Sequence, residues 1–523
     1  MIGNTMKEII YAIFLSFFLC GLCGNAEAKK KKEVKKAIKR EVQTPYDKLF
    51  KGKKAFTVNG LMKMHLMAGK VYAEFPMELL NRDLALTSSI ENISDNGEGV
   101  VGQFAGRMNQ FRFTLQDSML QARLVRRYGL KNTGMGKNAD QIIERSNTPG
   151  IFQSYKILAY TPDKKAVVVD MTELFLESSR LTNPFPSYAG NSLYGFVQRI
   201  HKFQSQRSEL LGICGNDNSM SVCCNLGFNV DRLVFGSFMQ AKDVPVSVTV
   251  NKILMLLPED PMRPRLADSR IGVNAIIQTE LPDVCQGIKP YYITKRWRIE
   301  PVDEIRYKRG EMVDVKKPIV FYIDTLMPDS WIKYVKAGAE AWNAAFEKIG
   351  LRNVVRTELF PKDSSFDAGD IHNSVIRYAP SWMYYPQYSM HTDPRTGEIL
   401  NASVYLPANV ASYFYTSRTG ETMAVDPSVR KARLSEEQFG EMFKAKMMQA
   451  IGRCLGLTDN YAASSVYPVD SLRSASFTRK YGVVASVMDD FTCNKIAQPE
   501  DVKKGVVLVQ QNLGPYDYEV IKY

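Results

Sequence analysis

The sequence predicts an α+β protein, with β-rich N-terminal and middle regions followed by a C-terminal α/β domain. Short apolar runs alternate with turn residues between about 45 and 300, a pattern typical of strands. After this region an apolar strand at 318–323 precedes an amphipathic helix at 331–349, and a second long helix begins near 435. Because 523 residues exceed what one hydrophobic core usually supports, we expect several domains.

Residues 1–28 have the organisation of a secretory signal peptide. An apolar run at 9–22 follows Lys7, and Ala26 and Ala28 provide the small residues of a cleavage site. The run is short for a membrane span. The sequence therefore predicts an exported chain that has no transmembrane helix once this leader is removed.

Residues 29–44 are expected to form a basic, disordered tail. Without the leader the chain has 67 Lys and Arg against 53 Asp and Glu, a net charge of +14. Half of this charge lies between Lys29 and Arg40, where eight basic residues accompany one Glu. Such a run is typical of a solvated tail. The alternative is attraction to an anionic envelope surface. Aromatic residues are not interleaved with it, so nucleic acid is not expected as a partner.

The remaining chain divides into three parts: a small β-rich module at 45–98, a β-rich middle domain at 99–301 and the α/β domain at 302–523. Strands of the first part are expected at 61–66 and 71–75. Those of the middle domain are expected at 111–115, 166–170, 246–250 and 253–257. Those of the last domain are expected at 318–323, 354–355, 375–378 and 399–406.

The long helix near 435 has a clear start and two distinct faces. Ser435 and Gln438 have the spacing of a capping box. An apolar face at intervals of three to four residues predicts ordinary core packing, and its members are Phe439, Phe443, Met447, Ala450 and Cys454. A separate stripe carries Lys446, Gln449 and Arg453.

The end of this helix has the frame of a zinc-peptidase motif. In that motif two His four residues apart share a helix face, a Glu follows the first, and a Gly allows the chain to return a third His to the metal. The frame residues are present as Gly452, Leu455, Gly456, Leu457 and Asn460. Residues 486–489 match the turn that passes beneath the metal in such enzymes, with Met488 as its methionine. On these residues the chain resembles the large secreted zinc-dependent metalloproteases of Gram-negative bacteria, of metzincin type.

The resemblance implies a zincin-like fold for 302–523, with a cleft above the helix. It implies that the strand at 399–406 is the edge strand of that cleft, where a peptide would add a further strand. It also implies a location in the periplasm or outer envelope of a Gram-negative bacterium. Members of the family hold zinc and cleave peptide bonds.

The residues at the four chemical positions of the motif depart from the family: they are Gln449, Ala450, Arg453 and Asp459. An amide oxygen is a weak ligand, alanine cannot act as a base, and a guanidinium stays protonated. Asp490 also replaces the tyrosine that follows the Met-Asp pair in the family. We therefore expect no zinc, no other cofactor and no catalysis, and a cleft that binds a peptide or a protein. The alternatives are an active metallopeptidase with non-standard ligands and a structural envelope protein.

The other polar groups suggest no replacement metal site. The four His are His65, His201, His372 and His391, and only the last two lie in the C-terminal domain. Neither of these two shares a helical turn with another donor, so a structural or surface role is expected for both, and His65 is expected on a strand surface. Three aspartates could gather around a hard cation or around Arg453: Asp459, Asp489 and Asp490.

Six cysteines follow the leader: Cys214, Cys223, Cys224, Cys285, Cys454 and Cys493. Pairing is plausible in an exported chain, and Cys214 with Cys223 or Cys224 would close a small loop. A bridge between Cys454 and Cys493 would join the motif helix to the segment that leaves the methionine turn. The alternative is that both are small buried thiols.

Overall fold

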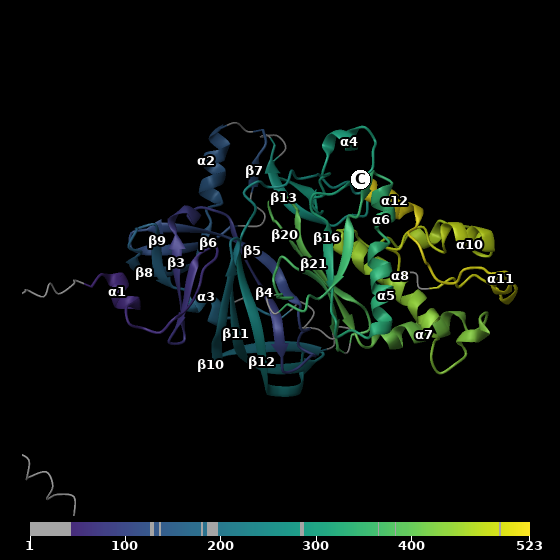
Figure 1. Ribbon diagram of the computed structural model, residues 1–523, viewed down its shortest axis with the longest axis horizontal. Helices are drawn as coiled ribbons and strands as arrows, with labels where there is room; N and C mark the ends of the chain where they lie inside the picture. The colour runs from purple at the N-terminus through teal and green to yellow at the C-terminus, as the bar shows by residue number, and fades with distance from the viewer. Residues whose placement is uncertain are drawn as a thin grey trace, which may run out of the picture. The chain divides into compact units, whose positions relative to one another are not determined.

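The computed structural model describes residues 43–125, 130–134, 137–178, 181, 183–185, 197–282, 287–363, 366–381, 383–490 and 493–523 (Figure 1). The predicted leader, all but the last two residues of the predicted tail, and Cys285 lie outside these residues. Pro45–Tyr523 is one compact unit. Within the described part of the chain, no helix is both long enough and apolar enough to cross a membrane.

The N-terminal and middle regions are β-rich, as predicted. Their described residues place eleven strands in one sheet, in the order β1-β2-β3-β9-β8-β6-β5-β4-β12-β11-β10. The strands are β1 (Phe56–Val58), β2 (Lys63–Met67), β3 (Lys70–Pro76), β4 (Leu84–Ile93), β5 (Phe104–Gln116), β6 (Met119–Leu124), β8 (Gly150–Tyr160), β9 (Ala166–Asp170), β10 (Val197–Asn216), β11 (Ser219–Val234) and β12 (Phe238–Leu256). The sheet contains strands from both sides of residue 98.

Long hairpins dominate the middle region, because β10, β11 and β12 pair antiparallel along most of their lengths. The strands predicted at 246–250 and 253–257 are parts of β12, which continues through the polar residues between them. A smaller sheet has the order β14-β13-β7, with β7 (Leu130–Asn132), β13 (Ala275–Leu281) and β14 (Lys289–Thr294). The helices of these regions are α1 (Pro45–Phe50), α2 (Lys137–Ser146) and α3 (Thr172–Leu176).

The C-terminal region has a five-stranded sheet in the order β18-β16-β19-β21-β20. Its strands are β16 (Ile319–Ile323), β18 (Val355–Leu359), β19 (Ser374–Ala379), β20 (Gln387–Thr392) and β21 (Ile399–Pro407), and a short pair is formed by β15 (Val313–Asp314) and β17 (Leu351–Arg352). All neighbours in the larger sheet are parallel except β20, which runs antiparallel to β21. The strands predicted in this region are therefore present.

The helices of the C-terminal region are α4 (Glu304–Lys308), α5 (Asp329–Glu340), α6 (Asn343–Glu347), α7 (Val410–Thr422), α8 (Glu436–Cys454), α9 (Val469–Leu472), α10 (Ala475–Tyr481), α11 (Pro499–Lys503) and α12 (Pro515–Lys522). The single helix predicted at 331–349 is instead α5 followed by α6. The chain breaks at Trp342, whose fully buried indole donates a hydrogen bond to the Met448 carbonyl oxygen at 2.9 Å. This tertiary contact overrides a continuous helical pattern.

The prediction that residues 399–406 form the edge strand of the sheet is wrong. The strand predicted at 399–406 is β21, and it is internal because β20 pairs with its outer side. The edge strand is therefore β20, whose sequence is too polar to have been recognised as a buried strand.

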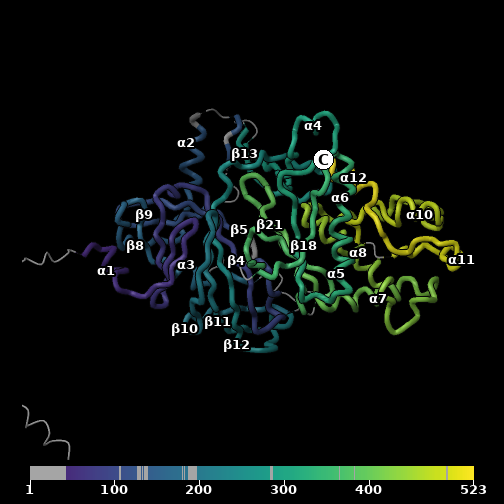
Figure 2. Tube along the Cα trace, in the orientation of Figure 1, coloured from purple at the N-terminus to yellow at the C-terminus, as the bar shows by residue number. Residues whose placement is uncertain are grey.

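Both faces of the five-stranded sheet are covered. Helices α5 and α8 pack together and bury the main core of the C-terminal region against one face (Figure 1). On the other face, a smaller cluster joins Phe104 of β5 and Ile253 of β12 to Ile371. The Phe104 amide also donates to the Tyr405 hydroxyl of β21 at 3.4 Å. Figure 2 shows the course of β4 and β5 in this orientation, and β5 contacts β20 of the C-terminal sheet.

Candidate functional site

Helix α8 is the floor of the candidate site, and its start is the predicted capping box. The Gln438 amide donates to the Ser435 hydroxyl at 3.2 Å, and the Ser435 amide donates to the Gln438 side chain at 3.0 Å. The predicted apolar face packs into the core, with Phe443, Met447 and Cys454 fully buried. Helix α8 is thereby fixed below β20 and β21.

Two glycines of the motif allow the close approaches that the turn after α8 requires. Gly456 has φ +99°, and a Cβ atom there would lie 2.4 Å from the Lys295 carbonyl oxygen. A Cβ atom on Gly452 would lie 2.4 Å from Met488 Sδ and 2.7 Å from the Trp342 ring. The methionine turn therefore passes directly beneath α8, as the sequence predicted.

A buried carboxylate holds this turn in place. Asp517 of α12 accepts hydrogen bonds from the Ser486 hydroxyl at 2.6 Å, the Val487 amide at 2.9 Å and the Gly514 amide at 2.7 Å. Burial raises the pKa of Asp517 to about 6, although these three donors favour its ionised form. Sequence reasoning missed Asp517, because nothing near it in the chain reveals a partner thirty-one residues away.

The four chemical positions of the motif bind one another and their surroundings. Arg453 donates through Nε and Nη2 to one carboxylate oxygen of Asp459, at 2.9 and 2.7 Å. The Gln449 amide nitrogen donates to the Asp489 carbonyl oxygen at 2.9 Å, which ties α8 to the methionine turn. Ala450 is buried. Arginine cannot ligate a metal, alanine offers no donor atom, and the Gln449 amide oxygen is at most a weak ligand.

The third member of the predicted stripe is also paired. Lys446 lies 3.1 Å from Asp490, and its ammonium is 5.8 Å from the ring centre of Tyr385 and 5.7 Å from that of Tyr413. Burial lowers the pKa of Lys446, and Asp490 opposes this effect. Asp489 instead accepts the Ser464 amide at 2.6 Å. The three aspartates therefore do not gather: Asp459 binds Arg453, and Asp490 binds Lys446.

Tyrosines surround these two ion pairs. Tyr388 projects from β20, and its ring centre lies 5.8 Å from Arg453 Cζ. Tyr385 and Tyr461 are exposed, and Tyr461 donates to Asp459 at 3.4 Å. Sequence reasoning missed these residues. Their one signal is the density of tyrosines just before and within β20. Together with Lys446, Arg453 and their aspartates, these tyrosines and Tyr413 lie where the sequence predicted the cleft, and the group is called the tyrosine cleft below.

The histidines have structural environments. His372 is exposed and bonds Asp370 at 2.8 Å, and His201 bonds Glu98 at 2.8 Å. The prediction that His65 lies on a strand surface is wrong, because it is buried and bonds both Thr57 and Glu74. His391 lies in β20 and is buried against Thr87 of β4. Within the described residues, no three His, Cys, Asp or Glu come close enough to hold a metal ion. The residues present at the motif positions do not fit zinc.

The predicted bridge between Cys454 and Cys493 is wrong, because both are free and buried. Cys454 Sγ lies 3.9 Å from the Ser403 carbonyl oxygen, whereas Cys493 Sγ lies 3.8 Å from Met442 Sδ. Met442 and Cys454 are twelve residues apart in α8, which corresponds to about 18 Å along the helix. A bridge needs Cα atoms within about 7 Å. The alternative of two small buried thiols is therefore correct.

The other described cysteines are also free: Cys214, Cys223 and Cys224. Across the β10–β11 ladder, Cys214 faces Ser221 and Cys223 faces Gly212. Cys224 is buried and donates to the Phe175 carbonyl oxygen at 3.2 Å. The small loop expected between these cysteines is not closed by a disulfide.

Comparison with protein families gives three matches along the chain. Residues 431–523, which include α8 and the methionine turn, match a family model described as Met-zincin. Residues 103–302 and residues 43–93 match two models that are each described as a domain of unknown function. No curated protein and no solved structure matches the chain.

Proposed function

We propose, from the premise that residues 431–523 are a metzincin-type zincin domain, that this protein is a metalloprotease relative without catalytic activity. In this proposal the tyrosine cleft binds an extended peptide or a segment of a partner protein. The observation that carries the proposal is the ion pair between Arg453 and Asp459, which joins two positions where the family places zinc-binding residues.

The charges of the cleft support loss of the metal. An arginine in place of a ligand puts a fixed positive charge where a dication would bind, and like charges repel strongly when partly buried. Arg453 is 21% exposed and Lys446 is 14% exposed, so both cations are largely shielded from water. Each is offset by one aspartate, which leaves the floor of the cleft close to neutral.

The position of β20 supports peptide binding. An edge strand offers unpaired backbone groups to an extended chain, and neighbouring side-chain pockets then select the sequence. Tyr388 and Met390 are two residues apart in β20, so both side chains lie on the face of the strand that is turned toward α8. The ring of Tyr388 lies close to Arg453 there. Tyrosine and arginine are the residue types that contribute most at binding surfaces.

The proposal also locates the protein outside the cytoplasm, in the envelope of a Gram-negative bacterium. This part rests on the sequence of residues 1–28, and the basic run from Lys29 to Arg40 would then face anionic envelope components. The two experiments below separate the proposal from its alternatives, an active metallopeptidase with other ligands and a purely structural protein.

Purified protein is expected to contain no stoichiometric zinc, because the motif positions supply a guanidinium, an alanine and at most one weak amide oxygen. Elemental analysis after dialysis measures this directly. A variant that combines Gln449→His, Ala450→Glu, Arg453→His and Asp459→His is expected to gain one zinc, while Arg453→His alone gains none. One tightly held zinc in the unmodified protein would overturn the proposal.

Replacing Tyr388 by alanine is expected to weaken peptide binding about tenfold, because a central tyrosine contributes a large contact area. Decapeptides enriched from a random phage library on the unmodified protein serve as probes, and fluorescence polarisation gives their affinities. Tyr481→Ala, which removes an exposed tyrosine of α10, is the matched control. If the library yields no binders, or if Tyr388→Ala binds them equally well, the tyrosine cleft is not a peptide site.

A further inference from the structure

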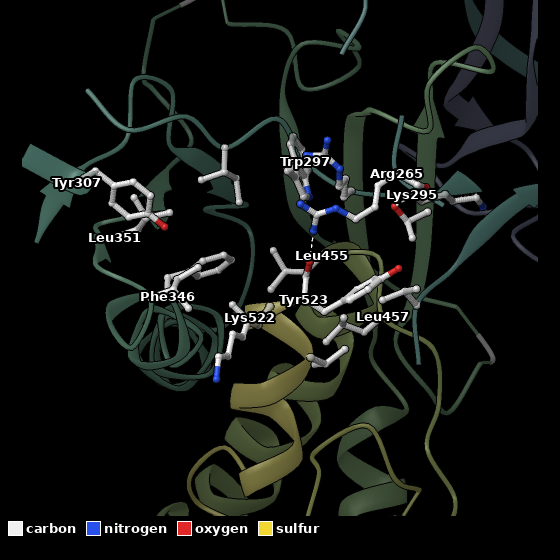
Figure 3. Close-up of a pocket in the computed structure, with 17 residues that line it drawn as sticks. Arg265, Lys295, Trp297, Tyr307, Phe346, Leu351, Leu455, Leu457, Lys522 and Tyr523 are labelled. Carbon is white, nitrogen blue, oxygen red and sulfur yellow. Dashed lines mark hydrogen bonds between the residues drawn. The ribbon is translucent and has the colours of Figure 1, made fainter. Parts of the chain in front are cut away.

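A second cavity lies at the C-terminal end of α8 and shares no residue with the tyrosine cleft. Its volume is about 270 Å³. Figure 3 shows Tyr307, Phe346 and Leu351 on one side of it and Trp297 and Leu455 on the other. Most of the residues that line it are therefore aliphatic or aromatic.

The polar part of this cavity is basic. Four cationic residues line it, and none of the lining side chains that the structure describes is acidic; the four are Arg265, Lys295, Arg296 and Lys522. A cavity that combines an apolar wall with an excess of positive charge is complementary to a molecule with an apolar body and an anionic end.

Arg265 places its guanidinium inside the cavity. Figure 3 shows this group between Trp297 and Tyr523, where it donates to the Tyr523 main-chain oxygen. Its Cζ lies 5.6 Å from the Tyr523 ring centre. Among the described residues, no Asp or Glu side chain lies within ion-pair distance of Arg265. Its remaining donors are available to a ligand.

Arg296 is a second guanidinium with donor capacity to spare. Its Nη2 donates to the Arg263 carbonyl oxygen at 2.8 Å, but its buried Nε has no partner among the described residues. The nearby carboxylate of Glu398 is held at 2.9 Å through both oxygens by Arg298. Burial lowers the pKa of Arg296, and the charge of Arg265 lowers it further. An anion beside Arg265 and Arg296 would relieve this repulsion and satisfy the buried donor.

We propose that this cavity binds a small anionic amphiphile, with a carboxylate beside Arg265 and Arg296 and a short unbranched alkyl chain against Phe346, Leu351 and Leu455. Guanidinium groups suit this head because they form paired hydrogen bonds with carboxylates. At about 30 Å³ for each water-sized group, the cavity holds about nine such groups, which matches an eight-carbon carboxylate.

Isothermal titration of the full-length protein with octanoate tests the proposal. One octanoate is expected to bind each chain, and 1-octanol and octylamine are expected to bind at least tenfold more weakly because they lack the anionic head. Raising the salt concentration weakens octanoate binding, since the head is recognised by charge. Equal affinities for octanoate and 1-octanol, or no binding of octanoate, would overturn the proposal.

Variants then locate the site. Arg265→Gln is expected to weaken octanoate binding at least tenfold without unfolding the protein, because Arg265 is an exposed residue. Arg270→Gln is the matched control, since this arginine is 86% exposed, is paired with Asp268 and does not line the cavity. Ile349→Trp, which fills the apolar end, is expected to abolish binding while leaving the phage-selected peptides bound. Octanoate binding that survives both Arg265→Gln and Ile349→Trp contradicts the assignment.

Discussion

Replacing Gly456 by alanine is expected to lower the free energy of unfolding by about 3 kcal/mol or more, or to prevent folding. The φ angle of +99° is strained for any residue with a side chain, and the new Cβ atom would meet the Lys295 carbonyl oxygen at 2.4 Å. Lys295 belongs to the backbone that carries the chain into the C-terminal region, so it cannot move as a flexible side chain would. Denaturant titration followed by circular dichroism measures the loss.

The matched control is Gly420→Ala in α7. Gly420 has helical surroundings, and nothing lies within 4 Å of the position where its Cβ atom would be. Alanine there is expected to stabilise the protein by about 0.5 to 1 kcal/mol, because glycine loses more conformational freedom in a helix. If Gly456→Ala unfolds at the same denaturant concentration as the unmodified protein, the motif glycine is not required for the turn after α8.

Gly456 also shows which features could be predicted from the sequence. The capping box at Ser435 and Gln438, the apolar face of α8, and the glycines of the motif are local patterns, and each fixes geometry within a few residues. The motif substitutions at Gln449 and Arg453 could be read in the same way. The pairing of Arg453 with Asp459 was one of two options, because a six-residue separation leaves the turn between them undetermined.

The features that were missed depend on contacts between distant segments. The edge position of β20 follows from its antiparallel pairing with β21, and its polar sequence gave no strand signal. Asp517 supports the methionine turn from a helix in a different part of the chain. The break before α6 follows from the burial of Trp342 against α8. Periodicity within one segment contains none of this information.

His391 shows the same dependence, because its environment comes from two regions of the chain. It lies in β20 and is fully buried against β4, with one ring nitrogen 2.8 Å from the Thr87 hydroxyl and the ring of Phe104 at 4.8 Å. Its Nδ1 has no partner in the part of the chain that the structure describes. A proton on that nitrogen would add a charge and an unsatisfied donor to this contact. Burial accordingly lowers the pKa of His391 to about 4.

Acidification from pH 6.5 to pH 4 is therefore expected to cost the folded protein about 3 kcal/mol through His391 alone. The unfolded chain takes up a proton near the ordinary histidine pKa of 6.5, whereas the folded chain resists it until about pH 4. The contribution of His391 to stability is thus fully present above pH 6.5 and is lost as the pH falls through this window.

His391→Gln, which keeps a hydrogen-bonding group for Thr87, is expected to remove this pH dependence of stability, as measured by denaturant titrations at each pH. His372→Gln, at an exposed histidine, is expected to keep the pH dependence of stability. Asp517 titrates with the opposite effect on stability, but both variants retain this residue, so its effect cancels when the two are compared. If the two variants show the same pH dependence as each other, His391 is not kept neutral by burial at the contact between β4 and β20.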